Sequence, residues 1–211
     1  TRDINVSRFV PQLQGKVNST LRVAGGLTPA LNTINAQGEA FLHLKQGTIQ
    51  AKQIQVSEGK FNTLLIPQKV KLAGFSPFLT GELDGRIKVS GALNELSPQT
   101  ILAQGNLNFN EGLSLIDRPL TAQFDWNGEK LAIKQAKARN FKAQGVVELD
   151  FANLSRQINP NTFIKNVNLT VKADGLNLHK LALPVPAPIA QLKYGGLIDF
   201  KGKIQGSLQA P

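Results

Sequence analysis

The chain has no cysteine and no methionine, and its 211 residues include only one tryptophan, one tyrosine and two histidines. Without cysteine, the chain forms no disulfide and no thiolate metal site. His43 and His179 have no carboxylate or second histidine at metal-ligand spacing, so no metal site is predicted. There is no apolar run of about 18 residues, so no transmembrane helix is expected.

Motifs that carry enzyme chemistry are also missing. No glycine-rich loop leads from a strand into a helix to hold a phosphate, and no nucleophile elbow occurs. Asp84, Asp125, Asp150 and Asp199 fall at polar positions of alternating segments, where solvated carboxylates are the default. We therefore predict that the chain is not an enzyme and binds no cofactor.

The net charge of the chain is +10, from 24 Lys and Arg against 14 Asp and Glu. This balance favours an anionic partner, although solubility alone would explain it equally well. The basic residues are spread along the polar positions of predicted strands, and no helix carries a basic stripe. Nucleic acid is therefore not expected as a partner.

Alternation of apolar and polar residues dominates the sequence. In segment 79–93, leucine, isoleucine, valine or glycine occupies every second position, and the intervening residues are mostly polar. Period two is typical of a β-strand with one buried face. Segments 13–27 and 194–208 align with it without a gap, and a proline follows each within a few residues. We expect these segments to be repeat-like strands.

The remainder of the chain alternates in the same way between turn residues. Asn127-Gly128, between two alternating runs, predicts a hairpin. Three prolines in 184–188 exclude a central strand or a regular helix there, which leaves a packed loop or an apolar lip. Period 3.6 is absent, so we predict one all-β domain over 1–211. Because the chain starts at Thr1 and lacks methionine, we expect a fragment of a longer protein.

Three architectures fit long strands with one apolar face. An outer-membrane barrel would need girdles of Trp and Tyr, which the chain lacks. A filled sandwich or barrel and an open, curled sheet both stay possible. Strand length and glycines on the apolar side favour the curled sheet, with an apolar groove that accepts acyl chains. The predicted lining residues are Val17, Leu21, Val23, Leu83, Ile87, Val89, Leu107, Phe109, Val147, Leu149, Phe151, Ile198, Phe200 and Ile204.

Three features together resemble a known family. They are the segment from Thr80 to Leu93 followed by Pro98, the segment from Gly196 to Pro211, and Ala-Gln-Gly beginning at Ala36, Ala103 and Ala143. These features resemble the repeat of the TamB family, which belongs to the wider AsmA-like group. The resemblance covers most of the chain but carries no catalytic residues.

The resemblance implies a long protein anchored in the inner membrane of diderm bacteria, with plastid relatives. Its strands would curl into a U-shaped trough that crosses the periplasm, or the intermembrane space of the plastid envelope. Its partners would be phospholipid and an Omp85-type, TamA-like outer-membrane protein. Its function would be phospholipid transport or support of outer-membrane protein assembly.

Two other functions stay open at this point. A chaperone-like module would hold outer-membrane protein strands by β-addition. A plain filled β-sandwich would have only a structural role. We also expect that the unpaired edge strands of a truncated sheet associate edge to edge between molecules.

Overall fold

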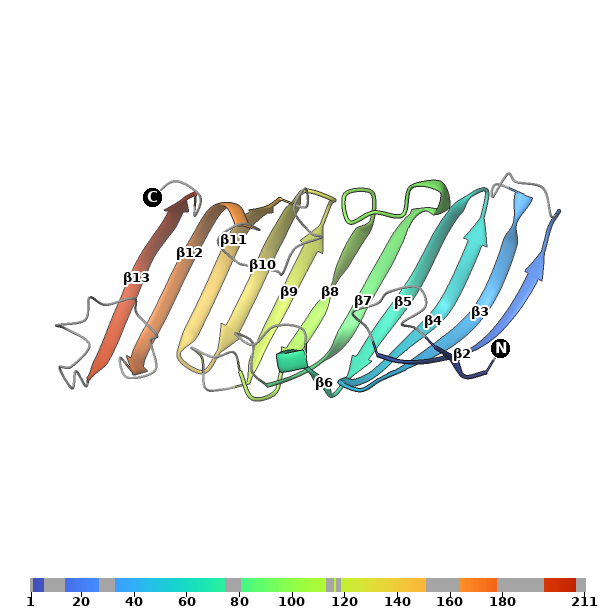
Figure 1. Ribbon diagram of the computed structural model, residues 1–211. Coiled ribbons are helices and arrows are strands. Elements are labelled where there is room, and N and C mark those ends of the chain that lie inside the picture. Colours follow the sequence, from blue (N-terminus) through green and yellow to red (C-terminus); the bar gives the residue numbers. More distant parts are fainter. Residues whose placement is uncertain are drawn as a thin grey trace.

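The structure is a computed structural model that describes residues 2–5, 14–26, 33–74, 81–112, 116, 119–150, 164–177 and 196–207. These residues form one antiparallel sheet of 13 strands (Figure 1). The strands are β1 (Ile4–Asn5), β2 (Gly15–Ala24), β3 (Asn35–Leu44), β4 (Gly47–Ser57), β5 (Lys60–Gln68), β6 (Val70–Lys71), β7 (Glu82–Ala92), β8 (Leu102–Phe109), β9 (Leu120–Trp126), β10 (Lys130–Ala138), β11 (Phe141–Leu149), β12 (Ile164–Asn177) and β13 (Leu197–Gly206). Two short 3₁₀ turns are η3 (Leu72–Gly74) and η4 (Leu93–Glu95).

The sheet is a meander in which strands adjacent in sequence are adjacent in space. Only β6 lies off this path, where it pairs with β7. The all-β prediction is confirmed. The sheet is open and not strongly curled, so it does not show the U-shaped trough expected from the sequence. Strands β2, β7 and β13 lie within the three repeat-like segments.

Pairing in register gives the sheet one continuous apolar face. Directly opposed residues of antiparallel strands lie on the same face. One unbroken row of such pairs crosses eleven strands and consists of Ser19, Ala40, Ala51, Leu65, Ile87, Gly105, Phe124, Ile133, Gly145, Leu169 and Ile204. We call the face that carries this row the apolar face and the opposite one the polar face. Among the described residues, no charged side chain occupies a paired position on the apolar face.

Bulges interrupt the period of two without interrupting the apolar face. In β4, Ala51 and Ile54 both face the apolar side because an extra residue lies between them, and Gln53 has a φ of +53°. An extra residue likewise separates Ile133 from Ala136 in β10. A bulge adds one residue to one strand and reverses the phase of alternation beyond it.

Burial is greatest at the β9–β12 end of the apolar face. Leu120, Ala136, Ala138, Ala143 and Val171 form a cluster there with exposed fractions of 3–8%. Ile116, from the connection between β8 and β9, packs against this cluster. The described residues place no second sheet and no α-helix against it.

Candidate functional site: the apolar face

The structure places thirteen of the fourteen predicted lining residues on the apolar face. Leu83 and Phe109 are direct cross-strand partners on β7 and β8. Ile87 lies in the eleven-strand row between Leu65 and Gly105. The other ten are Val17, Leu21 and Val23 on β2, Val89 on β7, Leu107 on β8, Val147 and Leu149 on β11, and Ile198, Phe200 and Ile204 on β13. Phe151 lies outside the described residues.

The sequence reasoning missed the apolar residues that the intervening strands contribute. Strands β3, β4, β5, β9, β10 and β12 supply large side chains to the same face, and β11 adds Phe141. In β4 the bulge reverses the alternation, which hides Ile54 and Val56 beyond it. The missed residues are Leu42, Leu44, Ile49, Ile54, Val56, Phe61, Leu65, Leu120, Phe124, Trp126, Leu131, Ile133, Phe141, Ile164, Val167, Leu169, Val171 and Leu176.

Each Ala-Gln-Gly tripeptide places its glycine on the apolar face between two large side chains. Gly38 lies between Leu21 and Ile54. Gly105 lies between Ile87 and Phe124, and Gly145 between Ile133 and Leu169, in the eleven-strand row. The glycines therefore leave room for their neighbours. The motif serves cross-strand packing and places no chemical group in a site.

The apolar face is most exposed at the two ends of the sheet. On β2, Leu21 and Val23 are 45% and 62% exposed, and on β13, Phe200 and Ile204 are 41% and 47% exposed. On β11, by contrast, Val147 is 9% exposed. Exposed apolar side chains that gather on one face are typical of surfaces that contact other apolar surfaces.

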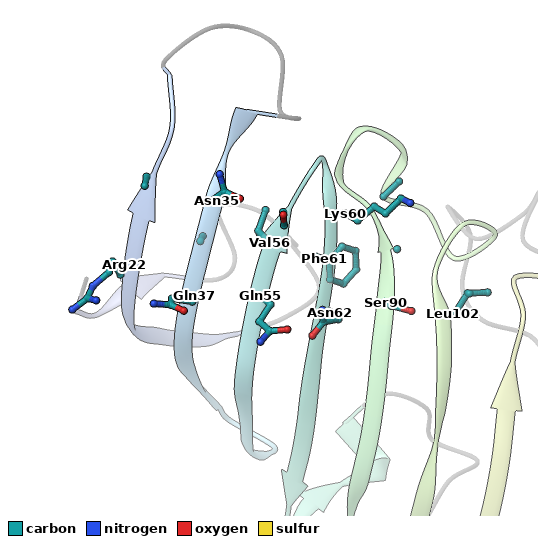
Figure 2. A pocket seen from close by; sticks show the side chains of 15 residues that line it. Arg22, Asn35, Gln37, Gln55, Val56, Lys60, Phe61, Asn62, Ser90 and Leu102 are labelled. Carbon is teal, nitrogen blue, oxygen red and sulfur yellow. The ribbon is translucent and has the colours of Figure 1, made fainter.

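A hollow near one end of the strands β2 to β8 is lined mostly by residues of the polar face, together with Ala36, Val56, Phe61 and Gly91 of the apolar face. Its volume is about 800 Å³. A register row of six side chains crosses it (Figure 2). This row consists of Arg22, Gln37, Gln55, Asn62, Ser90 and Leu102. The apolar residues predicted to line a groove belong to the opposite face.

Ion pairs on the polar face join lysines to carboxylates at exposed or half-buried positions. Lys130 Nζ lies 3.1 Å from Glu148 Oε1, and Lys134 Nζ lies 2.8 Å from Asp125 Oδ2. The hydrogen bond to Glu148, and then the charges of Glu148 and Glu129, raise the pKa of Lys130 above its usual value. Exposed pairs of this kind contribute little stability, so their role is to balance charge locally.

Neither a metal cluster nor a membrane-crossing helix is found in the part of the chain that the structure describes. No group of three or more His, Cys, Asp or Glu side chains converges there. No helix there is long and apolar enough to span a bilayer. Comparisons with protein-family models, curated proteins and solved structures find no match to this chain.

Proposed function

We propose that the protein is a non-enzymatic lipid-conducting segment of a TamB-like bridge and that its apolar face binds acyl chains. The observation that carries this proposal is the uncharged row from Ser19 to Ile204. At about 4.8 Å between strands, eleven strands span about 50 Å. Each methylene buried on such a surface contributes about 0.8 kcal/mol, so a lipid tail gains several kcal/mol anywhere along it.

The proposal includes a further bend of the open sheet into a trough when lipid is bound. This bend would bring the exposed apolar residues of β2 and β13, near opposite ends of the sheet, closer together. Their side chains would then be shielded from water. The parent protein would be anchored in the inner membrane and would cross the periplasm or the plastid intermembrane space. It would meet an Omp85-type, TamA-like protein at the outer membrane. These features rest on the sequence resemblance.

Native mass spectrometry of protein expressed in bacteria tests the proposal. We expect copurified phospholipid with the wild-type protein and none with Ile87→Glu, because the new carboxylate lies mid-row between Leu65 and Gly105. The matched control is Lys88→Glu on the polar side of the same strand. That control should keep its lipid.

Circular dichroism of each variant shows whether the sheet is intact. If Ile87→Glu lowers β-content, Ile204→Glu replaces it, since Ile204 is 47% exposed and tolerates a charge more easily. Lipid retained by a folded charge variant would overturn the proposal. Lipid-free protein that crosslinks through β13 to unfolded outer-membrane strands would favour the chaperone-like alternative, in which a bound strand extends the sheet.

A further inference from the structure

The polar face carries a ladder of lysines that the sequence does not place together. Lys137 on β10 pairs in register with Lys142 on β11, which pairs with Lys172 on β12, which pairs with Lys201 on β13. All four side chains are exposed. Four adjacent strands, labelled β10 to β13 in Figure 1, thus present one row of four positive charges about 14 Å long.

This arrangement is costly for the free protein. Like charges directly opposite one another on neighbouring strands destabilise a sheet. Among the described residues, Lys172 is the one member of the row with an ion pair, at 3.0 Å from Asp174. Asp199 lies two residues before Lys201, and its carboxylate accepts a hydrogen bond from the Gly175 amide.

The other two lysines of β10 are neutralised by carboxylates, which sets Lys137 apart on its own strand. Lys130 and Lys134 of β10 each have a carboxylate partner, Glu148 and Asp125 respectively. The fold therefore supplies carboxylates near one end of β10 and leaves Lys137 and Lys142 unpaired near the other. Arg139, in the turn after β10, adds a further exposed positive charge at the unpaired end.

We propose that the lysine ladder binds the anionic headgroup surface of a phospholipid membrane. Lysine is a flexible point charge, which suits mobile phosphate groups better than a fixed partner geometry. Protein–protein interfaces are depleted in lysine, which disfavours an acidic protein. The polar positions of β10–β13 hold no aromatic side chain among the described residues, so bases of single-stranded nucleic acid would have no stacking platform.

This surface is separate from the one that we propose for acyl chains. The ladder lies on the polar face, whereas the acyl-chain row lies on the apolar face of the same strands. The ladder would hold this end of the sheet against a bilayer surface, and lipid tails would travel on the other side. Loss of membrane binding and loss of copurified lipid are therefore separable results.

Vesicle co-sedimentation tests the ladder. The wild-type protein should bind phosphatidylcholine vesicles that contain phosphatidylglycerol, should bind pure phosphatidylcholine vesicles weakly, and should lose anionic binding in high salt. The double variant Lys137→Gln/Lys142→Gln should bind anionic vesicles about 25-fold more weakly, about fivefold for each lysine. The matched control Lys130→Gln/Lys134→Gln has the same change in net charge and should lose less than about twofold.

Several outcomes would overturn the proposal. They are equal losses in the two double variants, unchanged binding by the ladder variant, and equal binding to neutral vesicles. Duplex DNA that binds through the ladder while anionic vesicles do not would reassign the surface to nucleic acid. Urea unfolding gives an independent check, because removing like charges should raise the midpoint of the ladder variant. A lower midpoint for the ladder variant would contradict the inferred repulsion between the lysines.

Discussion

Gly145 shows how a single position sets the spacing of neighbouring strands. It has a φ of +143°. A Cβ added to it would lie closer to the Asn168 carbonyl oxygen of β12 than van der Waals radii allow. A side chain here would push β11 and β12 apart, and L-residues rarely adopt this φ. Gly38, at the same place in another Ala-Gln-Gly, has a φ of +155° and would meet the Thr20 carbonyl oxygen.

We expect Gly145→Ala to destabilise the protein by about 1–3 kcal/mol, because the added methyl group overpacks a position bounded by backbone. Urea unfolding measures this loss. The control is Gly202→Ala on β13, where an added Cβ meets only the flexible Phe200 ring at 3.1 Å. Equal losses in the two variants would show that backbone contact across the strands does not decide the cost.

At the scale of the element, the β9–β10 hairpin shows local sequence determining a turn. Asn127 Oδ1 accepts hydrogen bonds from the backbone amides of Glu129 and Lys130, at 3.1 and 2.8 Å. Gly128 adopts a φ of +100°, which glycine reaches at no steric cost. The predicted Asn-Gly hairpin is therefore confirmed, with Leu131 opposite Trp126.

Replacing Asn127 by alanine should lower the free energy of unfolding by about 1 kcal/mol, since two backbone donors lose their acceptor. Chemical denaturation measures this effect. Asn106→Ala is the control, because Asn106 lies mid-strand on the polar face, and no side-chain hydrogen bond involves it within the described ranges. A larger loss of unfolding free energy for Asn106→Ala would show that a mid-strand position matters more to stability than the turn hydrogen bonds.

At the scale of the whole molecule, stability is distributed along one dimension. Each strand from β2 to β13 contacts mainly the strands beside it, and the buried cluster is confined to β9–β12. Strands β2 and β13, near the two ends of the sheet, are exposed over most of their length. Such chains open locally from their least buried parts.

Hydrogen exchange should therefore be graded along the sheet. We expect the paired amides of β10 and β11 to exchange slowest, and those of β2 and β13 to exchange fastest. Mass-spectrometric exchange on peptides from each strand measures this order. Uniform protection from β2 to β13 would instead indicate that the sheet opens as one cooperative unit.

Much of the element structure was predictable because its causes are local. Alternation identifies β7 from its own residues, and Asn127-Gly128 identifies its turn. Bulges were not predictable in this way. The phase reversal at Gln53 in β4 has no local glycine to announce it, and it depends on pairing with β3. The strong curl expected from strand length and from glycines on the apolar side is also not seen, since the sheet is open.

By itself the sequence determined the β-class, the alternation of faces and thirteen members of the apolar face, because a period of two acts within each strand. Only the tertiary structure decided how the strands meet. Register joined Ser19 to Ile204 in one row and aligned Lys137, Lys142, Lys172 and Lys201 in another. Lys137 and Lys142 flank one hairpin, but Lys172 and Lys201 lie far from them along the chain. Which residues oppose one another depends on turn length and bulges in other strands, so no single segment encodes it.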